Sequence, residues 1–298
     1  MGKNYCIYHN ADFDGVASAA IIYNHICKTM RSSLELFGMN YGDEFPFWDK
    51  IDKDDVVYMV DFSLPFNDMI LLNDITTLIW IDHHATAIND IKDSDIYFEG
   101  VQKSGIGACR LVWDYIHSFK RSEPPFDKLV PPYAIELLSE YDVWIKDNPD
   151  TVPFQYGLKI VDNIMNPTIP VWTHLLKADK DDYYIKKIIE SGESVVKYID
   201  VYSESYCDIA AYPMEWEGHK VICINCSTHG TGSNLFKSVW DEKKYDFMIG
   251  YVLSKNGSWN VGLYSDKEGI HVGNIAKKYG GGGHPGAAGF ICDELPFK

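Results

Sequence analysis

Three short apolar runs in the first ninety residues, each followed by ionisable side chains, constrain the fold of this chain most strongly. The runs cover residues 4–9, 55–60 and 78–81, and the segments between them have helical features, among them the small residues early in 15–29 and a proline, Pro65, in an opening turn. Strands that alternate with helices indicate a parallel sheet covered by helices, because a parallel connection requires a crossover. We therefore expect an α/β fold.

The remaining chain continues this alternation and then changes character. Helices are expected over residues 104–119, 131–140, 154–165 and about 181–206. Beyond these, the pattern predicts four strands and two helices: strands 209–213, 220–225, 247–254 and 259–263, and helices at about 232–241 and 271–279. The sequence KNG at 255–257 predicts a hairpin turn. We infer a parallel-sheet domain (1–180), a helical linker (181–207) and a smaller mixed-sheet α/β domain (208–298).

The charge of the chain is acidic and unevenly distributed. Residues 208–298 contain nine lysines and ten acidic residues, which leaves 18 basic against 33 acidic residues in 1–207 and a net charge of −16 overall. Long nucleic acid is bound largely through lysine and arginine, and the chain has only three arginines. We therefore expect no long duplex partner but a short anionic substrate, held by metal ions, backbone amides and a few side chains.

Two further features of the sequence bear on the compartment. No apolar run approaches the roughly 18 to 20 residues of a membrane span, and the N-terminus lacks the apolar core of a signal peptide. The chain has seven cysteines, an odd number that favours reduced thiols, and the CxxC at 223–226 has no second pair with which to form a zinc site. We expect a cytoplasmic protein without a membrane partner.

Ionisable residues gather where the three apolar runs end. They are His9, Asp12, Asp14, Asp61, Asp82, His83 and His84. Taken singly, a D-x-D pair is about as often a helix cap, and a lone aspartate after a strand is more often a turn residue. Ligands bind at the carboxyl ends of parallel strands, however, and so many charges there would repel one another without cations. Carboxylate and imidazole ligands without thiolates suit Mn²⁺, Mg²⁺, Fe²⁺ or Co²⁺.

Five motifs resemble those of the DHH phosphoesterase superfamily, in the same order along nearly the whole chain. HNADFDGVASA (9–19), VVYMVDFSLP (56–65) and IDHHATA (81–87) are similar to its first three motifs, and ELLSEYDVW (136–144) to its fourth. GGGGHPGAAGF (280–290) resembles the glycine-rich motif of the DHH-associated domain. The similarity is greatest to the oligoribonuclease and cyclic-nucleotide phosphodiesterase branch, and it implies an active site in the cleft between the two domains.

The resemblance also implies two divalent metal ions, typically Mn²⁺, that share Asp61. Their ligands would be His9, Asp12 and Asp61 for one ion, and Asp14, Asp61, His83 and Asp142 for the other. His84 would face the substrate phosphate, and Asp82 would orient an imidazole.

The chain departs from many relatives at one position of this ligand set. Two residues separate His9 from Asp12, where many relatives have three. If His9 is not a ligand, water would complete the site formed by Asp12 and Asp61.

The glycine-rich motif is the main candidate for substrate binding. Four consecutive glycines are by default a flexible loop, but a backbone without side chains also lets N–H groups approach a phosphate closely. We predict substrate contacts from Gly281, Gly282, Gly283 and His284, with Ser104, Arg110 and Asn225 as weaker candidates.

Together these residues predict an enzyme, a phosphodiesterase that hydrolyses short oligoribonucleotides or linear or cyclic dinucleotides, as a monomer or homodimer. Two metal ions about 3.5 to 4 Å apart can share a hydroxide and direct it at phosphorus. A pyrophosphatase or exopolyphosphatase is the enzymatic alternative, although residues 208–298 contain no arginine to line a basic cleft. A non-catalytic protein that binds metal or nucleotide on the same fold is the third possibility.

Overall fold

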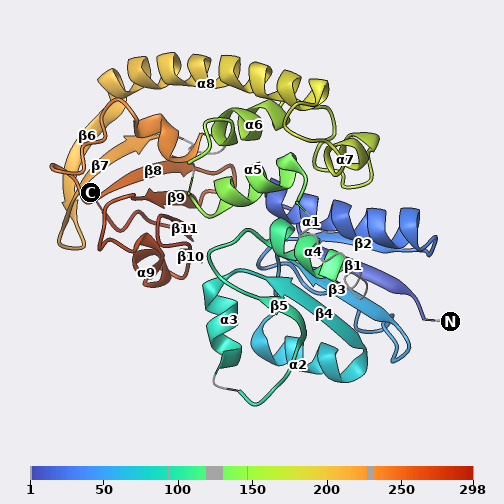
Figure 1. The fold of residues 1–298 in the computed structure, drawn as a ribbon. Helices are drawn as coiled ribbons and strands as arrows, with labels where there is room; N and C mark the ends of the chain where they lie inside the picture. Colours follow the sequence, from blue (N-terminus) through green and yellow to red (C-terminus); the bar gives the residue numbers. More distant parts are fainter. Residues whose placement is uncertain (1, 93, 119–129, 146, 227–230, 298) are drawn as a thin grey trace. The chain divides into compact units, whose positions relative to one another are not determined.

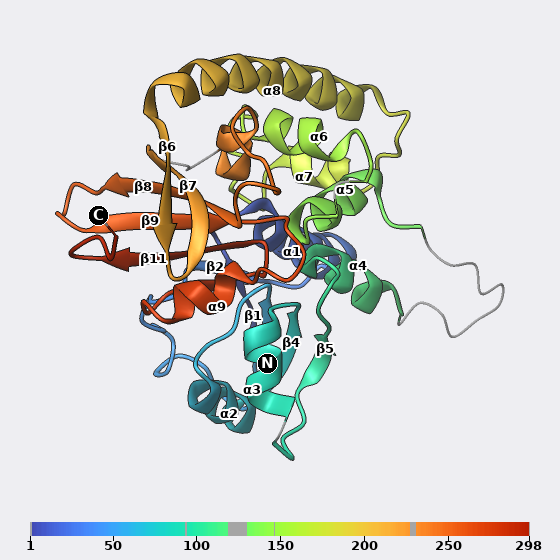
Figure 2. The same ribbon diagram turned by 90° about the vertical axis from the view of Figure 1, so that its left-hand side faces the viewer.

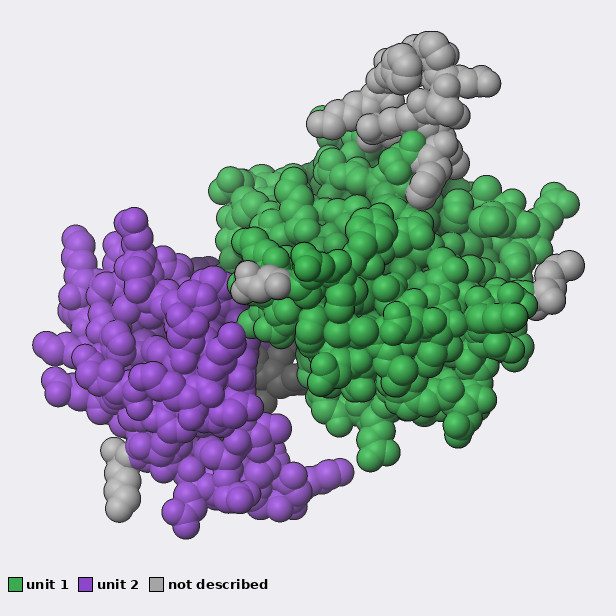
Figure 3. Space-filling model, turned by 90° about the horizontal axis from the view of Figure 1, so that it is seen from below, with its two compact units in different colours: residues 1–193 green, residues 194–298 purple. Residues whose placement is uncertain are grey.

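The computed structural model describes residues 2–92, 94–118, 130–145, 147–226 and 231–297. The chain forms two compact units, residues 1–193 and 194–298 (Figure 3). The first contains a five-stranded sheet and the second a six-stranded sheet, each accompanied by helices (Figure 1). The predicted α/β class, with a parallel sheet and a separate mixed sheet, is confirmed.

The sheet of the first unit is parallel, in the order β2-β1-β3-β4-β5. Its three central strands are the predicted ones: β1 (Asn4–His9), β3 (Val56–Val60) and β4 (Thr77–Asp82). The edge strands β2 (Glu35–Met39) and β5 (Glu99–Gln102) were not predicted. Both are short and only partly buried, so neither carries the apolar run by which a central strand is recognised.

Helices cover both faces of this sheet (Figures 1 and 2). Successive residues of a strand point to opposite faces, so Cys6 and Tyr8 pack in one core and Tyr5 and Ile7 in the other. The first core includes α1 (Phe13–Tyr23), α4 (Ala108–Ser118) and α5 (Tyr133–Asp142). The second includes α2 (Phe66–Ile75) and α3 (Ala85–Lys92). Burial on both faces explains why the central strands read as continuous apolar runs.

The remaining helices of the first unit differ in part from the expectation. The segment predicted as one helix over 15–29 is α1 followed by a π-helical turn, η1 (Asn24–Thr29). The helix expected over 154–165 is α6 (Thr151–Leu158), which ends early. Turns follow it, and Asn163 adopts a left-handed φ of 57° that a helix does not allow. A short helix, α7 (Pro170–Leu175), was not predicted.

The long helix α8 (Tyr183–Ala210) contributes to both units, because the division between them falls after Glu193. Its first turns pack against α6 at two glycines. A Cβ at Gly192 would lie 1.7 Å from the Pro153 carbonyl oxygen, and one at Gly157 would lie 2.0 Å from that of Ile188. Only glycine permits so close an approach of the two backbones.

The sheet of the second unit has the order β10-β11-β9-β8-β7-β6, with only β7 and β8 parallel. Its elements are β6 (Ala211–Trp216), β7 (His219–Asn225), β8 (Phe247–Leu253), β9 (Trp259–Tyr264), α9 (Val272–Lys277), β10 (Gly282–Gly283) and β11 (Ala287–Cys292). The predicted hairpin joins β8 to β9. The helix expected at 232–241 is instead a 3₁₀ turn, η3 (Gly232–Phe236).

Two predictions about the whole chain can be compared with the described residues. No helix in the described ranges combines the length and the apolar character needed to cross a membrane. The seven cysteines all lie in the described part of the chain, and none of them forms a disulfide there.

Candidate metal centre

The carboxyl ends of three neighbouring strands bring the predicted ligands of the first unit together. His9 is the last residue of β1 and Asp82 the last of β4, and Asp61 directly follows β3 between them. The Asp61 amide donates a hydrogen bond to the Ile81 carbonyl at 3.0 Å, which fixes the chain where the strand ends. Strand registry therefore positions these side chains, as expected for a parallel sheet.

A first group of possible ligands consists of His9, Asp12 and Asp61, whose ligand atoms all lie within 4.8 Å of one another. The His9 Nδ1 atom lies 3.1 Å from Asp12 Oδ2 and 3.8 Å from Asp61 Oδ2. Asp12 also caps α1, since its Oδ1 accepts a hydrogen bond from the Gly15 amide at 3.0 Å. One oxygen thus serves the cap while the other faces His9, so capping and metal binding are compatible at this residue.

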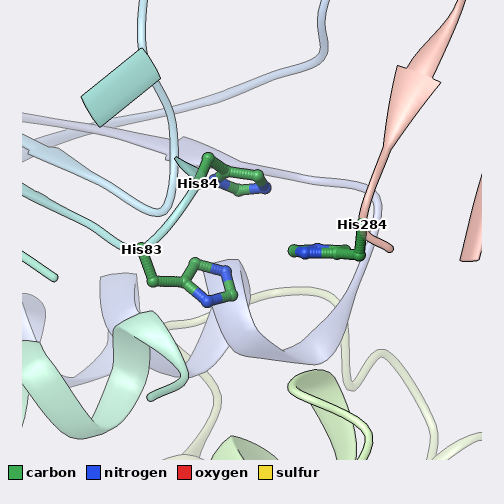
Figure 4. A group of neighbouring side chains, drawn as sticks. All are labelled: His83, His84 and His284. Atoms are coloured by element: carbon green, nitrogen blue, oxygen red, sulfur yellow. The ribbon is translucent and has the colours of Figure 1, made fainter. Parts of the chain in front are cut away.

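A second group converges on the Nε2 atom of His83. This atom lies 3.2 Å from Asp61 Oδ1, 3.2 Å from Asp142 Oδ2 and 3.8 Å from Asp14 Oδ2. Adjacent ligands of an octahedral ion with bonds of about 2.1 Å lie about 3 Å apart, so the spacing suits a divalent cation. Asp142 is the last residue of α5. His83 directly follows β4, and Figure 4 shows its side chain beside that of His84. Asp61 belongs to both groups.

Backbone amides at the start of α4 hold Asp14 in place. Its Oδ2 accepts a hydrogen bond from the Ala108 amide at 2.6 Å, and its Oδ1 accepts one from the Cys109 amide at 2.8 Å. Each oxygen keeps a second lone pair for a cation. These two amides were not predicted. The glycine that precedes them, Gly107, gives a local sign of a close approach, since its Cβ would lie 2.6 Å from the Ser139 Cα.

Two carboxylates of this centre have buried oxygens that accept no hydrogen bond from the described residues. Both oxygens of Asp61 and the Oδ2 of Asp142 accept no hydrogen bond from the described residues, and Asp61 is only 1% exposed. Burial, followed by the charges of the neighbouring aspartates, raises the pKa of Asp61 and of Asp142 well above the ordinary value. A divalent cation would satisfy these oxygens and offset their repulsion, so the residues present fit a metal site.

Asp61 also adopts an unusual backbone conformation. Its φ is 53°, in the left-handed region that non-glycine residues seldom occupy. The cost of this conformation is of order 1–3 kcal/mol, and such strain clusters at functional sites.

The two histidines of the DHH sequence have different environments. Burial lowers the pKa of His83, which favours the neutral imidazole that binds a metal. Burial acts in the same direction on His84, but its hydrogen bond to Asp82 and the surrounding carboxylates outweigh it, and the pKa of His84 is raised. The His84 Nδ1 lies 2.7 Å from Asp82 Oδ1, which also accepts the His83 amide at 2.7 Å. Asp82 thus holds the imidazole of His84 in one orientation.

Aromatic rings that the sequence analysis did not single out pack beside the first group. Tyr41 lies with its ring centroid 5.5 Å from that of His9, 5.8 Å from that of His84 and 5.0 Å from that of Phe62. Phe62 directly follows Asp61, and this adjacency is the sequence signal by which its position near the metal centre could have been predicted.

The weaker candidates of the first unit take no part in this cluster. Ser104 is exposed in the turn after β5. Arg110 lies on α4, and its Nε donates to Asp114 Oδ2 at 3.1 Å. This contact is an exposed pair four residues apart on one helix, which is a common surface feature.

In the second unit, the glycine-rich residues form an edge of the sheet. Gly282 and Gly283 are β10, paired with β11, and the His284 amide that follows donates a hydrogen bond to the Ala287 carbonyl at 2.8 Å. A Cβ at Gly281 would lie 2.0 Å from the Gly289 carbonyl oxygen, whereas one at Gly282 would meet open space. Packing therefore requires a glycine at Gly281 but not at Gly282. Asn225 is exposed at the end of β7.

The fold and the site define an α/β protein with a cluster of metal-binding side chains at the carboxyl ends of a parallel sheet. No family model matches the chain. Among curated proteins, the chain is similar to the protein described as uncharacterized protein R106 of Acanthamoeba polyphaga mimivirus. The two are 26% identical over an alignment 328 positions long, which covers 98% of this chain and 69% of that protein.

Three solved structures have a similar fold. The pGpG-specific phosphodiesterase PggH of Vibrio cholerae matches with a TM-score of 0.52 at 13% identity, over 97% of this chain and 93% of its own. The DHH domain of a protein described as a member of a family of ribosomal proteins matches with a TM-score of 0.52 at 15% identity, over 98% of this chain and 82% of its own. RecJ of Thermus thermophilus in complex with Mn²⁺ matches with a TM-score of 0.50 at 15% identity, over 99% of this chain and 50% of its own. The chain therefore shares its fold with these three proteins, one of which is described as a DHH domain.

Proposed function

We propose that this protein is a divalent-metal-dependent phosphoesterase that hydrolyses phosphodiester bonds in short oligoribonucleotides or in linear or cyclic dinucleotides. The observation that carries the proposal is the shared position of Asp61. Its two oxygens face different ligand groups, Oδ2 towards His9 and Oδ1 towards His83, and neither accepts a hydrogen bond from the described residues. Two cations bridged by one carboxylate are a common arrangement for phosphoryl transfer to water.

The names of similar structures support this choice of substrate. One is a pGpG-specific phosphodiesterase, and another, RecJ, was solved with Mn²⁺. The acidic charge of the chain favours a short nucleotide over a long one. We propose Mn²⁺ as the metal, with Mg²⁺, Co²⁺ and Fe²⁺ as the ions to compare.

The side chains of the centre have distinct roles in this proposal. Two divalent cations, when bound, would lower the pKa of a water molecule and neutralise charge on the phosphate oxygens. His9 and Asp12 would hold one cation, while Asp14, His83 and Asp142 would hold the other, and Asp61 would bridge them. The hydrogen bond between His84 Nδ1 and the Asp82 carboxylate raises the pKa of the imidazole and favours its protonated form, whose other N–H would donate a hydrogen bond to a phosphate oxygen.

In the second unit, we propose that Gly282 and His284 contact the phosphate of the substrate, with Gly281 and Gly283 shaping the segment. The open space at Gly282 leaves its backbone accessible to a ligand. Ser104, Arg110 and Asn225 remain weaker candidates for substrate contacts.

The proposal is tested by incubating the protein with Mn²⁺ and a panel of substrates. The panel contains RNA dinucleotides to pentanucleotides, linear and cyclic dinucleotides, cyclic mononucleotides, pyrophosphate and polyphosphate, with products separated by chromatography. We expect nucleoside monophosphates from the short diesters, no turnover after chelation, and no turnover in His83→Ala. The control His174→Ala alters an exposed histidine of α7 and should retain activity. Release of phosphate from pyrophosphate or polyphosphate alone would contradict the proposal.

A further inference from the structure

A cavity of about 480 Å³ lies in the first unit between the ends of β2 and β3 and helix α3. Its walls are largely apolar, and several of the lining side chains are aromatic: Tyr41, Phe62, Phe66 and Trp80. The Trp80 indole donates a hydrogen bond to the Phe62 carbonyl at 3.1 Å, so the floor of the cavity is fixed before any ligand arrives. The volume falls within the range of small-molecule sites.

The cavity shares a wall with the metal centre. Tyr41 and Phe62 line it, and the ring of Tyr41 also packs against the imidazoles of His9 and His84. Phe62 is the residue after Asp61. A molecule whose phosphate lies at the metal centre would therefore have this cavity within reach of its neighbouring group.

The charge of the cavity disfavours phosphate as its occupant. Among the described residues that line it there is no lysine, arginine or histidine, while Asp43 and Asp90 are both exposed at the rim. Ionised carboxylates only accept hydrogen bonds, so they favour a ring that presents N–H donors. The aromatic walls favour a flat ring on which they can stack.

We infer that this cavity binds the nucleobase of the nucleotide whose phosphate is at the metal centre, and that its acidic rim favours a base with N–H donors at its edge, such as guanine. This inference rests on the proposed function and adds to it a specificity site. It also separates a nucleotide substrate from pyrophosphate or polyphosphate, because neither has a base to fill the cavity.

The inference is tested by filling the cavity from α3. Thr86 is exposed and lines the cavity, and Asn89 is exposed on the same helix but does not line it, so Thr86→Trp and Asn89→Trp form a matched pair. Binding of guanosine 5′-monophosphate and of ribose 5-phosphate is measured by calorimetry, with EDTA and with Mn²⁺. Because stacking of a base contributes substantially to affinity, we expect the nucleotide to bind the unmodified protein about tenfold or more tightly than the sugar phosphate.

The two variants should then differ. Thr86→Trp should bring the nucleotide affinity down to that of the sugar phosphate, and Asn89→Trp should leave the difference intact. Asp90→Asn, which leaves the cavity open, should weaken nucleotide binding severalfold and ribose 5-phosphate binding not at all. Thermal unfolding of each variant checks that it is folded. A Thr86→Trp protein that still binds the nucleotide tenfold more tightly than the sugar phosphate would overturn the inference.

The same variants distinguish this inference from the proposed function. For a linear diguanylate, Thr86→Trp should raise KM at least about tenfold, while an analogue without bases should be hydrolysed at the rate of the unmodified protein. Base-dependent binding in a protein that hydrolyses no phosphodiester would leave the cavity assignment standing and reject the proposed function. Hydrolysis of dinucleotides with an unchanged KM in Thr86→Trp would support the proposed function and reject the cavity assignment.

Discussion

Asp61 in the first unit and Asp246 in the second show two ways of holding an aspartate in a fold. Asp246 is partly exposed and paired: its Oδ1 lies 2.6 Å from the Lys267 Nζ and its Oδ2 lies 3.2 Å from the His219 Nδ1. The bond to Lys267 is the main reason why the pKa of Asp246 is lowered. Asp61 is buried among other aspartates, and its pKa is raised. The chain thus provides its own cation for Asp246, whereas the two oxygens of Asp61 accept no hydrogen bond from the described residues and fit the divalent cations that we propose.

The largest effect is expected from Asp61→Asn. An amide is a poor metal ligand, so Mn²⁺-dependent turnover should fall about a thousandfold or more. The metal-free protein should be at least as stable as before, since a buried, repelled charge is removed. Steady-state kinetics and thermal unfolding in EDTA measure the two outcomes. Substantial Mn²⁺-dependent turnover in this variant would contradict the bridging role.

A smaller loss is expected from Asp82→Asn, which keeps the shape of the side chain but removes its charge. The change should lower kcat about 10- to 100-fold, as typical for a residue that orients a neighbouring ligand or acid. Because the Asp82 carboxylate raises the pKa of His84, the basic limb of the kcat–pH profile should move to lower pH. An unshifted profile would show that His84 does not act in its protonated form.

His9→Ala tests the one position at which the spacing of the first motif is unusual. If His9 binds the first cation, Mn²⁺ affinity should weaken about 10- to 100-fold and activity should return at high Mn²⁺ concentration. Titration of activity against Mn²⁺ measures this effect. Equal affinity in the variant would mean that Asp12 and Asp61 bind their cation with water in place of the imidazole.

The response of stability to Mn²⁺ should depend on pH. The pKa values of Asp14, Asp61 and Asp142 are raised in the folded protein, mainly by burial, so the folded state holds more protons than the unfolded one. Their contribution to stability is present below about pH 3.9 and is lost as the pH rises through their folded pKa values. Mn²⁺ replaces those protons, so it should raise Tm more at pH 8 than at pH 5.5. A larger shift at the lower pH would argue against carboxylate ligands.

The smallest effect is expected from Asp246→Asn. Removal of a partly exposed charge paired with Lys267 should cost about 0.5–1 kcal/mol of stability. Turnover and the Tm increase with Mn²⁺ should not change. Loss of the Mn²⁺ response in this variant would show that the contrast between the two aspartates does not hold.

Much of this arrangement could be predicted because it depends on local sequence. The three central strands carry continuous apolar runs, and each ends beside its ionisable residues, so registry alone brings His9, Asp61 and Asp82 together. Asp12 and His83 follow from the same strand ends, because each lies within a few residues of one.

The remainder depends on contacts between distant segments. The edge strands β2 and β5 are stabilised by pairing with β1 and β4, and their own residues carry a weak signal. Tyr41 reaches the metal centre because β2 places the following loop beside β1, and no periodic pattern predicts that position. The amides that hold Asp14 are likewise 94 and 95 residues away along the chain.

The bonds from Ala108 and Cys109 to Asp14 make the start of α4 part of the metal centre in a thermodynamic sense. A carboxylate that binds a cation stays ionised and in place, and it therefore continues to accept these two N–H groups. Burial raises the pKa of Asp14, so loss of the cation would make protonation of one oxygen easier, and a protonated oxygen would accept a weaker bond from the helix. If Asp14 binds the proposed cation, exchange of these two amide hydrogens with solvent would report metal occupancy.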